Sequence, residues 1–187
     1  MVEKLTSTVL NSLVPYAMPV ELEWVRNFAA SLQEGAIVVM IGAGPGVFAL
    51  ALFEGLVNPI DFFVIDHKTC SWVDVHLQLA GVRTERVVYL VADSSDVGRG
   101  WRRKQVDFLL VDGDHSYSGV LKDIDAWWPV VRRGGTVFFH DFLAREGGFS
   151  GVGEWSVSDV ARAVEDRRTG EWEILEQVGI SLVVKKK

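Results

Sequence analysis

Five runs of uninterrupted apolar residues recur along the chain, separated by segments with a different spacing. They are 36–41 (AIVVMI), 61–66 (DFFVID), 87–92 (VVYLVA), 106–112 (VDFLLVD) and 136–140 (TVFFH). Runs that do not alternate with polar residues are typical of strands covered on both faces. They predict the strands of a parallel sheet that lies between two layers of helices.

Helical spacing marks the segments between these runs. Residues 71–80, 119–131 and 157–164 carry apolar side chains at intervals of three and four, which predicts helices with one buried face. Gly134 and Gly135 are expected to end the second of these helices. Strands that alternate with helices in this way predict an α/β fold.

Two more strand-like runs come near the end of the sequence, at 172–177 and 181–185. The residues between them are too few for a helical crossover, so these two strands must run antiparallel to each other. At the other end, residues 1–33 are interpreted as two N-terminal helices, the first over 2–13, that pack on the sheet. The length suits a single domain over residues 1–187.

Charge and composition disfavour several classes of function. The net charge is −6, from 19 Lys and Arg against 25 Asp and Glu, which argues against a nucleic-acid partner. The uncharged stretch 36–53 is interrupted by three glycines and Pro45, so no membrane span is expected. Cys70 is the single cysteine, and the first ten residues show no basic head before an apolar run, so we expect a cytoplasmic protein.

A glycine-rich loop, GAGPG at 42–46, follows the first run. In an open parallel sheet, ligands bind at the carboxyl ends of the strands, where the strand order reverses. Missing side chains let a ligand approach the backbone there, and the next helix offers free N–H groups. Gly42, Ala43 and Gly44 are therefore candidate cofactor-binding residues, although tight strand-to-helix turns also use glycine without any ligand.

Acidic residues stand at or just after the ends of the next four runs, namely Asp66, Asp93, Asp112 and Asp141. Asp66 can accept both hydroxyls of a ribose, and His67 is a candidate contact to the ribose or the adenine. Asp93 and Ser94 are short polar residues that suit an adenine edge. Either aspartate could instead be a helix N-cap, but their combination with the glycine loop favours adenosine binding.

Val47 narrows the choice of cofactor. A dinucleotide-binding loop has a third glycine at this position, so NAD and FAD are disfavoured, and an NAD(P)-dependent oxidoreductase stays as a lower-ranked alternative. No P-loop lysine follows the loop. S-adenosylmethionine, which carries a ribose, an adenine and a methionine tail but no phosphate, fits the pattern better.

The motif IGAGPG, with Asp66, Asp93-Ser94 and the terminal hairpin, resembles the class I S-adenosylmethionine-dependent methyltransferases. The segment 106–142, VDFLLVDGDHSYSGVLKDIDAWWPVVRRGGTVFFHDF, is more specific. It resembles the O-methyltransferase-like branch with a DGDHSY motif, and is similar in layout to metal-dependent catechol and caffeoyl-CoA O-methyltransferases. The resemblance implies a Rossmann-like, doubly wound seven-stranded sheet, mostly parallel, with an antiparallel last strand inserted between the fifth and sixth.

The resemblance also implies O-methylation of a small hydroxylated molecule. Asp112 and Asp141 match two ligands of a divalent cation, Mg²⁺ or another, and His115 matches the lysine base of the catechol-type enzymes. His115 and Asp112 are therefore the candidate catalytic residues, and Asp112 is also a candidate cofactor contact. Met40 departs from the family, which usually has an acid there to orient the methionine end. Phe142 stands where the catechol-type enzymes have an asparagine that completes the metal site.

Other interpretations of these residues stay open. Asp112 could order loop amides without a metal, and His115 could be a packing residue of its turn. His140 is interpreted as an interior histidine rather than a ligand. Met40 and Phe142 would also suit a scaffold protein that binds the cofactor without catalysis.

Segments outside the sheet are expected to recognise the methyl acceptor. The glycine-rich stretch 143–155 can act as a lid, and 14–20 can close over the cofactor. No large insertion provides a second recognition domain, which favours a small-molecule acceptor. The Trp127–Trp128 pair is a candidate contact of a homodimer, with part of it in the core.

Overall fold

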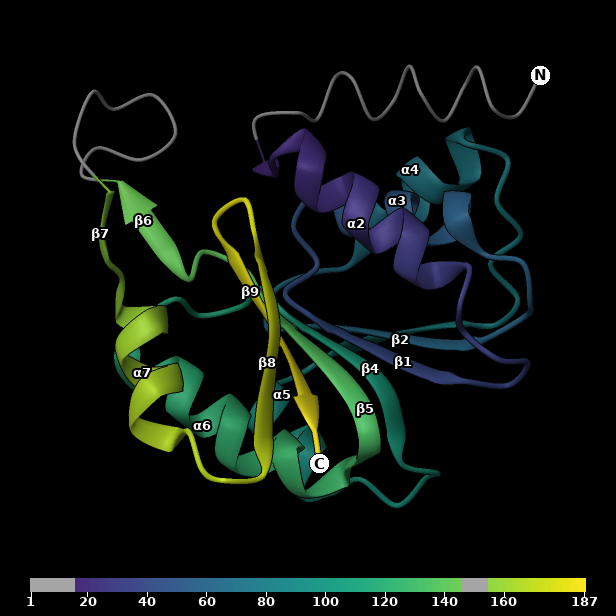
Figure 1. The fold of residues 1–187 in the computed structure, drawn as a ribbon. Helices are drawn as coiled ribbons and strands as arrows, with labels where there is room; N and C mark the ends of the chain where they lie inside the picture. Colours follow the sequence, from purple (N-terminus) through teal and green to yellow (C-terminus); the bar gives the residue numbers. More distant parts are fainter. Residues whose placement is uncertain (1–15, 146–154) are drawn as a thin grey trace.

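A seven-stranded sheet forms the middle of the molecule in the computed structural model, which describes residues 16–145 and 155–187 (Figure 1). The strand order is β3-β2-β1-β4-β5-β9-β8. The strands are β1 (Ile37–Ile41), β2 (Asp61–Asp66), β3 (Val87–Val91), β4 (Val106–Val111), β5 (Val131–Phe139), β8 (Trp172–Val178) and β9 (Ser181–Lys186). The chain leaves β1 toward β2 and β3 and returns to the other side of β1 with β4. The predicted doubly wound α/β fold is confirmed.

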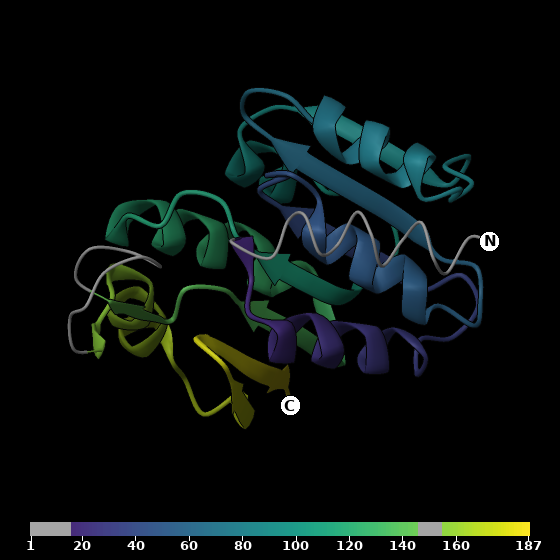
Figure 2. The ribbon, with the colours of Figure 1, turned by 90° about the horizontal axis from the view of Figure 1, so that it is seen from above.

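Helices cover both faces of this sheet (Figures 1 and 2). On one face lie α2 (Pro19–Ala29), α3 (Val47–Gly55) and α4 (Ser71–Leu79), and on the other lie α5 (Ser94–Arg99), α6 (Tyr117–Trp127) and α7 (Asp159–Arg167). Neighbouring residues of β1 point to opposite faces of the sheet. Val38 packs in the core under α2, α3 and α4, and Val39 packs in the core under α5, α6 and α7. Every residue of β1 is buried, as its uninterrupted apolar run predicts.

The two edge strands are only partly covered. In β3, Val88 and Val91 are exposed, so the expectation that this run is covered on both faces is wrong. In β8, Ile174 and Leu175 are exposed as well. A strand at the edge of a sheet has helices over only part of its width, and the apolar run alone does not reveal that position.

The C-terminal hairpin has the predicted arrangement. β9 runs antiparallel to both β5 and β8, so it is inserted between them. Glu21 on α2 fastens this hairpin, because its Oε1 accepts hydrogen bonds from the Ile180 amide at 3.2 Å and the Ser181 hydroxyl at 2.6 Å. Its Oε2 accepts from the Met18 amide at 2.8 Å, and the Glu21 side chain is fully buried. Helix α2 is thus tied to the hairpin of β8 and β9.

Several boundaries differ from the expectation. The helix predicted over 119–131 ends at Trp127 and passes into a 3₁₀ turn at Trp128–Val130, because Pro129 has no amide hydrogen to continue it. Gly134 and Gly135 do not end that helix and lie within β5, which begins at Val131. Trp127 is buried and Trp128 stacks on Trp172 with ring centroids 4.3 Å apart, so both rings pack within the chain. The homodimer stays a prediction.

The stretch predicted as a lid begins and ends in a small sheet of its own, with β6 (Leu143–Arg145) antiparallel to β7 (Trp155–Val157). Val157 belongs to this sheet, and α7 begins after the N-cap Ser158, whose hydroxyl accepts from the Ala161 amide. The predicted helix 2–13 and the middle of the lid lie outside the described residues. Among the residues described, no helix is long and apolar enough to cross a membrane.

Gly42 and Gly44 offer a matched test of the turn after β1. Both have positive φ angles, 84° and 44°. A Cβ atom at Gly42 would lie 1.9 Å from the carbonyl oxygen of Asp112, whereas one at Gly44 would have no atom within 4 Å. We expect Gly42→Ala to lower the free energy of unfolding by about 3 kcal/mol, and Gly44→Ala by only about 1 kcal/mol of backbone strain. Urea unfolding of the two variants checks this, and equal losses would contradict it.

Candidate active site

A pocket of about 620 Å³ opens where the carboxyl ends of β1 to β4 meet α5 and α6. We call it the first pocket. It is lined by Ile41, Gly42, Gly44, Ile65, Asp66, His67, Ala92, Asp93, Ser94, Ser95, Asp112, Gly113, Asp114, Gly119, Lys122 and Asp123. All the predicted cofactor-binding residues line it except Ala43, which lines a neighbouring pocket. The edge where parallel strands end is where such sheets bind ligands.

Asp66 holds the glycine loop in place. Its Oδ2 accepts a hydrogen bond from the Ala43 amide at 2.9 Å, and its Oδ1 accepts from the Lys68 amide at 2.8 Å. A carboxylate oxygen has two acceptor sites, so each oxygen of Asp66 keeps one for a ligand hydroxyl. Gly44 faces open space, which leaves its backbone accessible from the pocket.

Asp93 is the N-cap of α5, one of the interpretations that the sequence left open. Its carboxylate accepts from the Ser95 amide at 2.9 Å and hydroxyl at 2.6 Å, and from the Asp96 amide at 3.2 Å. The Ser95 hydroxyl and these amides lower the pKa of Asp93. Asp93 therefore shapes the wall of the first pocket through the helix that it starts.

Asp123 on α6 is a pocket residue that the sequence analysis missed. It is only 4% exposed, and it accepts a hydrogen bond from the Ser94 hydroxyl. Burial raises its pKa to about 6, with the hydrogen bond from Ser94 opposing. The sequence does contain a signal for a buried carboxylate. Asp123 lies on the apolar stripe of its helix, three residues after Val120 and four before Trp127.

A second pocket of about 290 Å³ adjoins the first and shares Gly44 and Asp112 with it. Its other lining residues are Tyr16, Met40, Ala43, Pro45, Gly46, Val47, Phe48, His115, His140 and Asp141. Tyr16 belongs to the stretch predicted to close over the cofactor, and it lines this second pocket instead of the first. Apolar walls and a charged floor suit a small organic molecule with a polar group.

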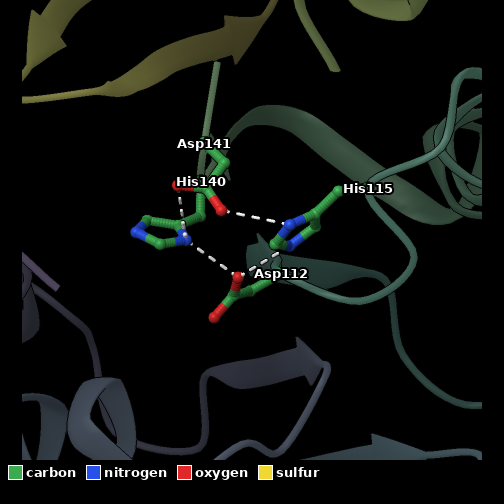
Figure 3. A group of neighbouring side chains, drawn as sticks. All are labelled: Asp112, His115, His140 and Asp141. Carbon is green, nitrogen blue, oxygen red and sulfur yellow. Dashed lines mark hydrogen bonds and ion pairs between the residues drawn. The ribbon is translucent and has the colours of Figure 1, made fainter. Parts of the chain in front are cut away.

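Two histidines and two aspartates form the floor of the second pocket (Figure 3). We call Asp112, His115, His140 and Asp141 the His–Asp cluster. The Nε2 of His115 lies 3.1 Å from Oδ1 of Asp112, and its Nδ1 lies 3.1 Å from Oδ2 of Asp141. The Nδ1 of His140 lies 2.8 Å from the same Oδ1 of Asp112. One potential ligand atom from each residue lies within 4.8 Å of the others.

The charges of the cluster compensate one another. Hydrogen bonds to Asp112 and Asp141 raise the pKa of His115 to about 10. Burial lowers the pKa of His140, but the charges of Asp112 and Asp141 and the hydrogen bonds to Asp112 and Glu21 together outweigh it and hold the pKa well above the ordinary value. Burial raises the pKa of Asp112, and the two imidazoles reverse this and keep it ionised. The protein thus holds two carboxylates facing each other by placing protonated rings between them.

His140 is interior, as expected, at 3% exposed, yet its ring also belongs to the cluster. Its Nδ1 faces Asp112, while its Nε2 lies 3.5 Å from Oε2 of Glu21. The sequence analysis set an interior histidine against a ligand as alternatives, but the two are compatible, because this ring is both buried and aimed at the site. Asp141, the next residue, has a φ of 52°, and aspartate is one of the few residues that adopt this region. That backbone turn brings Asp141 to the other side of His115 from Asp112.

The geometry agrees with comparisons to known proteins. A family described as a methyltransferase domain matches residues 39–142, which span β1 to the end of the His–Asp cluster. The chain belongs to this methyltransferase family. It is an S-adenosylmethionine-dependent methyltransferase, and the nicotinamide alternative loses its basis. None of the curated proteins matches the sequence.

Solved structures share the fold at low sequence identity. A Corynebacterium glutamicum protein is 19% identical with a TM-score of 0.74, covering 99% of this chain and 88% of its own. The O-methyltransferase of Bacillus cereus, in complex with S-adenosylhomocysteine, is 14% identical with a TM-score of 0.67, covering 99% and 90%. The Streptomyces achromogenes O-methyltransferase TomG, involved in tomaymycin synthesis and in complex with S-adenosylmethionine, is 14% identical with a TM-score of 0.68, covering 95% and 89%.

Because Asp123 is buried, we expect the free energy of unfolding to depend on pH. Its pKa is raised from the ordinary 3.8 to about 6, with Asp93 and Asp114 adding to burial and Ser94 and Lys122 opposing it. The folded state therefore binds a proton that the unfolded state has released, and stability falls as the pH rises from about 4 through about 6. We expect Asp123→Asn to remove about 3 kcal/mol of this fall. Urea unfolding of both proteins between pH 4 and 7 checks it, and parallel profiles would contradict it.

Proposed function

We propose that this methyltransferase transfers the methyl group of S-adenosylmethionine to a hydroxyl of a small molecule, with His115 as the general base. The observation that carries the proposal is the junction of the two pockets at Gly44 and Asp112. A donor in the first pocket and an acceptor in the second would meet there, beside His115. Methyl transfer requires this in-line alignment more than any other contribution from the protein.

The residues of the first pocket suit the parts of the donor in order. The open backbone of Gly44 and the turn from Gly42 through Ala43 suit the sulfonium end, which needs close approach rather than a phosphate site. Asp66 keeps acceptor sites for two ribose hydroxyls, with the exposed His67 beside it. Ser94, on the wall that Asp93 caps, suits the adenine. The polar groups and the volume of the pocket support this assignment.

S-adenosylmethionine supplies a methyl group on a positively charged sulfur, which an oxygen nucleophile displaces to leave S-adenosylhomocysteine and a methyl ether. His115 would accept the hydroxyl proton of the acceptor. It is 44% exposed on its side chain and lies at the floor of the second pocket, within reach of a bound molecule. Asp112 and Asp141 hold this ring in its protonated form. His115 therefore has to release one proton and break one of these contacts before the freed nitrogen can accept the proton of the acceptor hydroxyl.

The His–Asp cluster also fits a divalent cation. Asp112 and Asp141 supply carboxylates, and Nδ1 of His140 supplies a third ligand from the strand end next to them. Phe142 has no polar side-chain atom to offer where the catechol-type enzymes have an asparagine, and His140 would compensate for it. The imidazole of His140 in this set favours Mn²⁺, Co²⁺ or Zn²⁺ more than Mg²⁺. A cation held there would lower the pKa of an acceptor hydroxyl.

Glu21 supports the role of His140 as a ligand. Metal-bound histidines commonly present their second ring nitrogen to a carboxylate, which fixes the orientation of the ring. His140 has this arrangement, with Nδ1 toward the cluster and Nε2 toward the fully buried Glu21. The scaffold alternative would leave this buried arrangement without a purpose beyond packing.

If His115 is the general base, replacing it should impair catalysis and leave the binding of the methyl donor almost unchanged. We expect His115→Gln to lower kcat by about 100-fold or more, because the proton acceptor is lost. The affinity for S-adenosylhomocysteine should stay within about threefold, because His115 does not line the first pocket. Transfer of labelled methyl to a panel of small phenols and alcohols, together with calorimetric titration of S-adenosylhomocysteine, measures both. Nucleoside binding by the unaltered protein with no transfer to any acceptor would favour the scaffold alternative.

The cation proposal is tested by binding, independently of activity. We expect Glu21→Gln to weaken the affinity for Mn²⁺ by about tenfold, because the orientation of His140 is lost. Glu23→Gln is the matched control, since Glu23 lies on the same helix and is exposed. Paramagnetic resonance of free Mn²⁺ gives both affinities, with thermal melting to verify folding. Equal affinities in the two variants would contradict the role of Glu21.

A further inference from the structure

Asp123 is a buried carboxyl group to which the proposed methyl transfer assigns no role. It lines the first pocket from α6, and its Oδ1 accepts the hydrogen bond from Ser94. Its Oδ2 is within 3.8 Å of the place where Gly113 would carry a Cβ. Among the described residues, no hydrogen bond reaches Oδ2. A buried carboxyl group with an unpaired oxygen lowers the stability of the fold. Its position on the wall of a pocket therefore points to a role in binding a ligand.

The arrangement of the pockets indicates which part of the donor lies near Asp123. The sulfonium has to be at the junction with the second pocket, at Gly44 and Asp112, for the methyl group to reach an acceptor. The ribose comes next, beside Asp66. The base is then the part farthest from the junction, against the wall that α5 and α6 form together. Ser94 and Asp123 are joined across this wall by their hydrogen bond.

We propose that Asp123 recognises the exocyclic amino group of adenine through Oδ2, and so determines the base specificity of the donor pocket. This inference rests on the proposed function, since it takes the first pocket as the donor site. The carboxylate accepts a hydrogen bond from the amino group, and a base with a carbonyl oxygen at this position places two acceptors against each other. Ser94 is a positioning residue, because its hydroxyl fixes Oδ1 and thereby the direction of Oδ2.

A site built to accept a hydrogen bond rejects an analogue that cannot donate it much more strongly than a merely apolar site does. The 6-oxo analogue S-inosylhomocysteine carries a carbonyl oxygen in place of this amino group and a proton on the neighbouring N1. We therefore expect the unaltered protein to bind S-adenosylhomocysteine at least about 30-fold more tightly than S-inosylhomocysteine.

Asp123→Asn tests the origin of this preference. The amide has the shape of the carboxylate but can also donate to a carbonyl oxygen, so the ratio of the two affinities should fall below about 3. Asp125→Asn is the matched control, because Asp125 lies on the same helix and pairs at the surface with Arg167. It should keep the original ratio. Calorimetric titration with the two nucleosides gives all the affinities.

Four outcomes decide the matter. A ratio that collapses in Asp123→Asn and stays in Asp125→Asn supports the inference. An unchanged ratio in Asp123→Asn overturns it while leaving the proposed function intact. Failure of the unaltered protein to bind S-adenosylhomocysteine overturns both. Should Asp123→Asn fail to fold, Ser94→Ala replaces it, and a ratio that does not fall at least about fivefold overturns the inference.

Discussion

The close approach of β1 and β4 at Gly42 is the constraint on which the rest of the site depends. There the Asp112 amide donates to the Ile41 carbonyl at 2.8 Å, and the Gly42 amide donates to the Ile65 carbonyl at 2.9 Å. On the far side, the His140 amide donates to the Val111 carbonyl at 3.0 Å. The ladder of the sheet thus continues beyond the strand ends and holds the first residue after each strand in register. Both pockets rest on this edge.

Charge compensation is the second element of the site. Carboxylates gathered at one edge repel one another, and burial makes each of them more costly. His115 and His140 reduce this cost by lying between acids: His115 faces two carboxylates and His140 faces three. The same donor atoms would suit a cation, which explains why one arrangement can serve both as a stable cluster and as a reactive centre.

The sequence could predict those parts of the site that follow from strand ends. Gly42, Asp66 and Asp112 each come at or just after an apolar run, and parallel strands bring such positions together. Glu21 and Asp123 could not be found this way, because each lies on a helix whose packing partner is far along the chain. Both do stand on the apolar stripe of their helix, and a charged residue there is a usable signal. The edge position of β3 also depends on strand order, which no local pattern contains.

The bond between Glu21 and Ser181 joins residues that are 160 positions apart. Glu21 is synthesised before β1, and the hairpin that it binds is synthesised after β5. Until that hairpin emerges from the ribosome, the carboxylate behind His140 lacks its two partners on the hairpin. Assembly of the reactive centre is therefore completed only after the parallel part of the sheet has been made.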